Sequence, residues 1–106
     1  MSFRDHYYIL NDSGEPVPAH DITTWGKWHK TAKRHVAEDH LPGGVRVSTV
    51  FLGIDHRFGM EGPPVLWETM IFGGPHGGYQ ERYTSKADAI AGHLEALRLA
   101  RTERPV

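Results

Sequence analysis

Two apolar runs joined by a loop constrain this chain more than any other feature. The first is RVSTVFLGIDH, from Arg46 to His56, and the second is VLWETMIFG, from Val65 to Gly73. Both are rich in the β-branched and aromatic residues that favour strands. Residues 57–64 contain two Pro and two Gly, which end regular structure between the runs. We predict a long β-hairpin at the centre of a small sheet.

The strand pleat distributes the side chains of the first run between two faces. One face carries Ser48, Val50, Leu52, Ile54 and His56, and the other carries Val47, Thr49, Phe51, Gly53 and Asp55. Both sets are largely apolar, so we expect both sides of this strand to be at least partly covered.

Glu68 lies on a strand face that is otherwise made of Leu66, Met70 and Phe72. A carboxylate that is buried there without a partner costs several kcal/mol. We therefore expect Glu68 to pair with a cation such as Arg82, or to open onto a pocket where it binds a ligand or takes part in catalysis.

Shorter patterns predict the flanking elements. Strands are expected over Phe3–Leu10, Lys33–Leu41 and Tyr79–Tyr83, and helices over Asp21–Thr31 and Lys86–Arg101. Residues 33–41 could also extend the first helix, but a strand is preferred because residues 42–44 (Pro-Gly-Gly) then form a hairpin turn. The apolar stripe of the last helix is predicted at Ile90, Leu94 and Leu97, with His93 at its border.

The element order β-α-β-β-β-β-α predicts an α+β fold. We expect a two-layer sandwich in which two helices pack on one face of a mainly antiparallel sheet of about five strands. A length of 106 residues favours a single domain over residues 1–106. No apolar run reaches the roughly 18 residues of a membrane span, and the N-terminus has no signal-peptide core. The chain contains no cysteine, which fits a reducing compartment. We expect a cytoplasmic protein that does not bind membranes.

The eight His residues direct attention to acid–base chemistry. Motifs for phosphate loops, serine hydrolases and zinc proteases are absent. His56, Glu68 and His93 could all lie under the last helix, where they could act as catalytic residues with or without a divalent metal. No cofactor and no metal-ligand set can be assigned. His35 and Asp39 share a strand face, as metal ligands can, but a solvated charged edge is favoured.

Aromatic residues near arginine can hold nucleotides. On this basis the candidate ligand-binding residues are Trp25, Asp55, Arg82 and Tyr83. The alternative, which we favour for Trp25 and Trp28, is that the aromatic rings pack in the core. The net charge of -1 gives no general attraction for polyanions, so extended nucleic acid is not expected as a partner.

The segments VSTVFLGIDHRFG, GPPVLWETMIFGG and ERY, followed by a helix with AGH, resemble a family of small uncharacterised proteins from tailed phages and prophages. The resemblance covers most of the chain from about Asp21 onward, and it departs from the family at Lys86–Asp88. The matching positions are Trp25, Val36, Ser48, Thr49, Phe51, Gly53, Asp55, His56, Phe58, Pro63, Pro64, Glu68, Met70, Phe72, Gly73, Tyr83 and His93. The resemblance implies a phage-infected bacterial cytoplasm as the setting, and no mechanism.

Three hypotheses for the function follow. The first is an accessory protein that binds a host protein or a small ligand, as a homo-oligomer, because we expect two helices of the predicted lengths to leave apolar sheet surface uncovered. The second is a small hydrolytic enzyme that uses His56, Glu68 and His93. The third is a sponge for a signalling nucleotide, with Trp or Tyr as the stacking surface.

Overall fold

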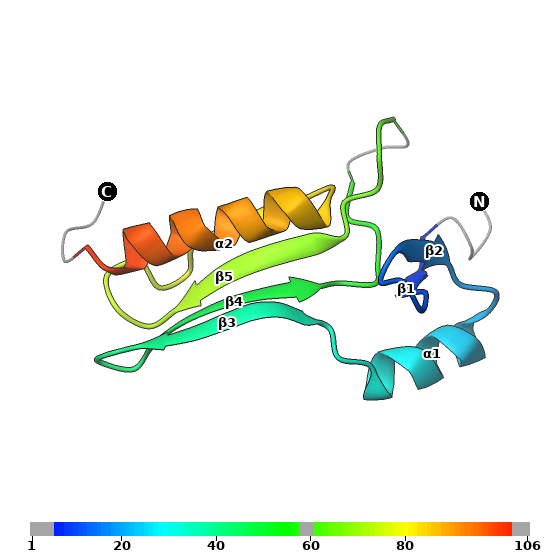
Figure 1. The fold of residues 1–106 in the computed structure, drawn as a ribbon, viewed down its shortest axis with the longest axis horizontal. Helices are drawn as coiled ribbons and strands as arrows, with labels where there is room; N and C mark the ends of the chain where they lie inside the picture. Colours follow the sequence, from blue (N-terminus) through cyan, green and yellow to red (C-terminus); the bar gives the residue numbers. More distant parts are fainter. Residues whose placement is uncertain (1–5, 58–60, 103–106) are drawn as a thin grey trace.

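The computed structural model describes residues 6–57 and 61–102. Its elements are β1 (Tyr8–Leu10), β2 (Pro16–Pro18), α1 (Ile22–Thr31), β3 (His35–Leu41), β4 (Val45–Phe51), β5 (Trp67–Phe72), β6 (Gln80–Tyr83) and α2 (Lys86–Ala100). β3 to β6 form a four-stranded antiparallel sheet in the order β3-β4-β5-β6. The α+β class, both helices and the strand over residues 35–41 are confirmed (Figure 1).

The prediction of one sheet of about five strands is wrong, because β1 pairs with β2 in a separate two-stranded ribbon. The physical reason lies at Gly53. Its φ of 78° turns the chain, so the strand predicted over Arg46–His56 ends at Phe51. The carbonyl of Gly53 then accepts hydrogen bonds from the backbone N–H of Tyr8 (2.8 Å) and from Trp25 Nε1 (3.0 Å). This contact attaches the N-terminal ribbon and α1 beyond the end of β4.

The prediction that the two helices pack on the same face of the sheet is wrong. α2 lies along one face of the four-stranded sheet, whereas α1 lies beyond the end of the sheet, next to β1 (Figure 1). α1 begins after Asp21, whose side chain accepts a hydrogen bond from Thr24 N–H. α2 begins after Ser85, whose hydroxyl accepts one from Asp88 N–H. Asp and Ser are residue types that commonly cap the start of a helix in this way.

The core lies between α2 and the sheet, in two apolar clusters. One cluster is formed by Val47, Ile71, Ala96 and Leu97, and the other by Phe51, Leu66, Trp67 and Ala89. In the sheet register, the pair Thr49–Thr69 stands between the pairs Val47–Ile71 and Phe51–Trp67. Polar side chains therefore occupy the middle of the covered face.

The predicted apolar stripe of α2 is wrong at two positions. Ile90 and Leu94 point outward and are 45% and 62% exposed. The helix instead buries Ala89, His93, Ala96 and Leu97. Small residues allow a helix axis to come close to the sheet. α2 is thus rotated about its axis relative to the prediction, and this rotation brings His93 to the centre of the interface.

The other face of the four-stranded sheet is not covered by a helix in the described part of the chain (Figure 1). Ion pairs cross this uncovered face: Glu38 accepts a hydrogen bond from Arg46 Nη1 at 3.0 Å. The guanidinium of Arg46 in turn lies 4.2 Å from the ring centroid of Phe72. No residue of β4 is exposed, and Ser48 on this face is buried. The expectation that both sides of β4 are at least partly covered is therefore confirmed, although no described helix covers this side.

Replacing Gly92 by alanine should test the close fit of α2 against the sheet. A Cβ at Gly92 would overlap the ring and hydroxyl of Tyr83. We expect Gly92→Ala to lower the free energy of unfolding by about 1–3 kcal/mol, measured by urea denaturation. Gly26→Ala in α1 is the matched control, because nothing lies near its Cβ position; it should be neutral or stabilising by up to about 1 kcal/mol. Equal stability of the two variants would contradict the close packing of Gly92 against Tyr83.

Candidate functional site

A chain of buried hydrogen bonds links α2 to three strands through His93. Its Nδ1 lies 2.7 Å from Thr49 Oγ1 on β4, and its Nε2 lies 2.7 Å from Asp39 Oδ2 on β3. The hydroxyl of Thr49 is also hydrogen-bonded to the hydroxyl of Thr69 on β5. Because a carboxylate only accepts, Nε2 donates to Asp39. In the neutral imidazole, Nδ1 then accepts from Thr49, and Thr69 donates to Thr49.

The order hydroxyl, imidazole, carboxylate is also that of a nucleophile with its base and orienting acid. Burial decides against that role. Thr49 is 0% exposed, so its hydroxyl has no access to a substrate. The Asp39 side chain, at 48% exposed, is the end of the chain that meets solvent. The hydrogen bonds instead satisfy polar groups in a region where an unpaired group is costly.

Glu68 lies on the uncovered face of the sheet. Its Oε2 accepts hydrogen bonds from Arg82 Nε at 2.9 Å and from Gln80 Nε2. The predicted pairing of Glu68 with Arg82 is confirmed. Because its neighbour Thr69 points toward His93, Glu68 points away from it. The expectation that Glu68 and His93 share a site under α2 is wrong.

The segment after β4 holds the other predicted site residues. Asp55 Oδ1 accepts hydrogen bonds from the backbone N–H groups of Arg57 and Val65, both at 2.9 Å, and Oδ2 lies 2.7 Å from Arg57 Nε. Asp55 thereby ties together the two ends of the loop between β4 and β5. His56 is exposed, and its backbone N–H donates to the carbonyl of Val65. These contacts give Asp55 a structural role.

Aromatic contacts hold α1 in place. The Trp25 ring stacks on His29, with centroids 4.5 Å apart, and meets Tyr7 edge-on at 5.0 Å. Trp28 packs edge-on against Phe51 at 5.8 Å. The favoured interpretation, that these tryptophans pack in the core, is confirmed in part: Trp28 packs against the core cluster at Phe51, whereas Trp25 is half-buried beside Tyr7 and His29. Tyr83 also packs against the core cluster at Phe51.

Cations without a carboxylate partner gather where α1 meets β3. Four arginines elsewhere form ion pairs with acidic residues: Arg46, Arg57, Arg82 and Arg98. Within residues 6–57 and 61–102, no such pair is formed by Lys27, Lys30, Lys33 or Arg34. Burial, together with the charge of Arg34, lowers the pKa of His29 beside them.

Two adjoining hollows meet at residues 33–35, and we call them together the cationic depression. The open one, of about 500 Å³, is lined by His29, Lys30, Ala32, Lys33, Arg34 and His35. The narrower one, of about 140 Å³, is lined by Leu10, Gly14, Lys33, Arg34, His35, Val36, Phe51, Trp67 and Lys86. The depression thus lies at the junction of the N-terminal unit and the main sheet, a common place for a ligand site.

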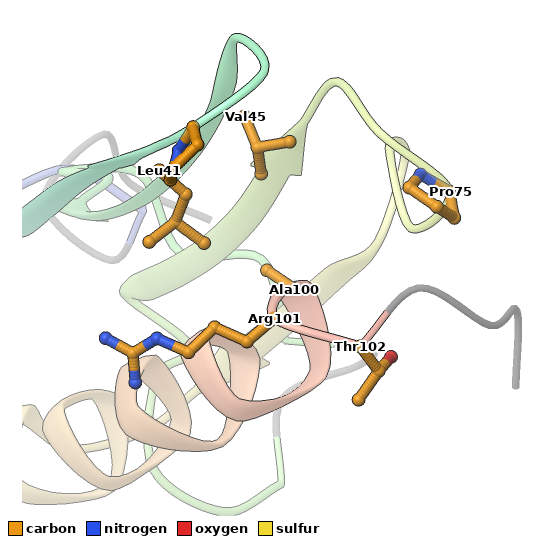
Figure 2. Close-up of a pocket in the computed structure, with 7 residues that line it drawn as sticks. Leu41, Val45, Pro75, Ala100, Arg101 and Thr102 are labelled. Atoms are coloured by element: carbon orange, nitrogen blue, oxygen red, sulfur yellow. The ribbon is translucent and has the colours of Figure 1, made fainter.

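A third hollow, of about 400 Å³, lies at the opposite end of the sheet. Figure 2 shows Leu41 and Val45 of the β3–β4 hairpin directed toward Ala100 near the end of α2, with Pro75 on a neighbouring loop. Its walls are mainly apolar, and Arg101 is its one charged lining residue. This hollow offers far less charge to a ligand than the cationic depression does.

Comparison of the chain with protein-family models, curated proteins and solved structures finds no match. Among the described residues, no group of three or more His, Asp and Glu side chains could hold a metal ion. Neither described helix has the length and apolar character needed to cross a membrane.

Replacing Thr49 by valine should show what the buried hydrogen bonds contribute. Valine keeps the shape but leaves His93 Nδ1 and the Thr69 hydroxyl without their partner. We expect a loss of about 1–3 kcal/mol in the free energy of unfolding, measured by urea denaturation. Thr23→Val, at an exposed position of α1, is the control and should change it by less than about 0.5 kcal/mol. A Thr49→Val protein as stable as the control would show that these hydrogen bonds contribute nothing to the free energy of unfolding.

Proposed function

We propose that this protein acts by binding, without catalysis, and that it recognises a negatively charged ligand through the cationic depression. The observation that carries the proposal is the set of cations at residues 27–34 that form no ion pair with described residues. The resemblance to small phage proteins is consistent with an accessory role in an infected cell, and that setting is part of the proposal.

The charge of this region stands apart from the charge of the whole chain. Residues 27–35 (KWHKTAKRH) contain four cations and two histidines and no acidic residue, whereas the chain carries a net charge of -1. A concave surface with charge of one sign concentrates ligands of the opposite sign and speeds their association. Partial neutralisation of the α1 dipole accounts for cations in its last turn, but not for Lys33 and Arg34 beyond it.

Two side chains that could have supported catalysis are already engaged. The hydroxyl of Thr49 is enclosed under α2, and Glu68 is held by Arg82. Binding at an open, charged surface is therefore better supported than hydrolysis.

Removing charge from the depression should weaken ligand binding. Lys30 and Lys33 are both exposed, so Lys30→Gln with Lys33→Gln removes two charges without disturbing the core. Arg98→Gln with Arg101→Gln, on exposed positions near the end of α2, is the matched control. We expect thermal-shift screening of nucleotides, sugar phosphates, tricarboxylates and acidic peptides to find ligands for the wild type and the control, with affinity at least tenfold lower for the lysine variant. The absence of binding by every class of anion would overturn the proposal.

A homo-oligomer remains a prediction, and α2 offers a place to test it. Ile90 and Leu94 are one turn apart on the outer face of this helix and are both exposed. If a second copy covers them, light scattering should give a multiple of 11.9 kDa that falls to the monomer mass in Leu94→Glu. Ile22→Glu, an exposed position on α1, is the control and should leave the mass unchanged. A wild-type monomer at all concentrations would contradict the prediction.

A further inference from the structure

We infer that the cationic depression takes a small phosphorylated ligand that carries a planar ring, with a phosphate between Lys33 and Lys86 and the ring in the open hollow lined by His29. The inference rests on the proposed function and names the chemical class of its ligand. Four observations support it: the convergence of cations, their anchoring, the size of the two hollows and the nature of the ring beside them.

Cations from distant parts of the sequence converge on the narrow hollow. Lys33 and Arg34 come from the segment between α1 and β3, and Lys86 is the first residue of α2. Within the described part of the chain, none of the three forms an ion pair with a carboxylate. Cations at the end of a single helix could be explained by the dipole of that helix. Cations from two elements that line one hollow are the arrangement that a compact anion with several oxygens requires.

The backbone and side chain of Arg34 are fixed before any ligand arrives. Its carbonyl accepts a hydrogen bond from Phe51 N–H at 2.8 Å, and its Nη1 donates to the carbonyl of Phe51 at 3.2 Å. The guanidinium has five N–H donors in a planar fork, so this bond leaves others for a ligand. A donor that is held in place loses less entropy on binding than a free lysine does.

The sizes of the two hollows indicate which part of the ligand each of them can hold. The narrow hollow of about 140 Å³ has room for a phosphate but not for a complete nucleotide. Its floor includes the buried rings of Phe51 and Trp67, which exclude water and strengthen the attraction between charges. The open hollow of about 500 Å³ adjoins it across Lys33 and has room for the remaining ring.

His29 is an aromatic residue that lines the open hollow. It is stacked on Trp25, with an angle of 27° between the rings, so its orientation is fixed. Its pKa is lowered by burial and by Arg34, which favours the neutral imidazole near neutral pH. A neutral aromatic ring of fixed orientation suits stacking against a nucleobase.

Isothermal titration calorimetry with ADP, adenosine, pyrophosphate, citrate and an oligoglutamate peptide tests the inference. We expect ADP to bind at least tenfold more tightly than adenosine and more tightly than pyrophosphate. Lys33→Gln with Lys86→Gln, both exposed positions, should weaken ADP at least tenfold, whereas Arg98→Gln with Arg101→Gln should not change it. His29→Ala should weaken ADP but leave pyrophosphate unchanged. Circular dichroism and thermal melting establish that each variant is folded.

The outcomes separate this inference from the proposed function. Binding of citrate or oligoglutamate without binding of any phosphorylated probe would overturn the inference and leave the proposed function standing. Equal affinity for ADP and pyrophosphate would overturn the part played by the ring, and with it the nucleotide class. ADP binding that survives in the Lys33/Lys86 variant would overturn the location. No binding of any of the anions would overturn both proposals.

Discussion

The hydrogen bonds of His93 are the contacts on which the rest of this structure depends. They connect α2 with β3 and β4 through Asp39 and Thr49, across the middle of a core that is otherwise apolar. Apolar contacts alone would tolerate a range of helix positions, because the hydrophobic effect has no direction. A buried imidazole with both nitrogens bonded has one satisfied position. We infer that these bonds select the rotation of α2.

The rotation of α2 has consequences on both of its sides. Toward the sheet it places small residues, and Gly92 lies so close to Tyr83 that a methyl group would not fit. Toward solvent it leaves Ile90 and Leu94 exposed. Apolar side chains that could have added to the core therefore lie on the surface of the helix. The face of the sheet away from α2 carries ion pairs instead.

The turn at Gly53 determines where the cationic depression forms. A left-handed backbone conformation is accessible to glycine without the steric cost of a Cβ. There the chain leaves β4, and the exposed carbonyl receives Tyr8 and the indole of Trp25. The N-terminal unit is thus attached beside the sheet rather than on it. The depression at this junction is lined by four cations, Lys30, Lys33, Arg34 and Lys86.

Local interactions let the sequence determine most of the secondary structure. Alternating β-branched residues gave β4 and β5, the capping residues Asp21 and Ser85 gave the helix starts, and the Pro-Gly-Gly turn gave the β3–β4 hairpin. The pairing of Glu68 with Arg82 was also predictable, because an apolar strand face demands a partner for a carboxylate. Each of these depends on residues close in sequence or on adjacent strands.

Contacts between residues far apart in sequence were decided by the tertiary structure alone. Helical periodicity placed Ile90 and Leu94 inward, but the side that α2 turns to the sheet was set by His93 meeting Asp39, 54 residues away. The convergence of Lys33 with Lys86 likewise depends on the packing of elements that no local pattern relates. A sequence states which groups need partners; which partners they receive depends on the register and distance of packed elements, and these exist once the chain has folded.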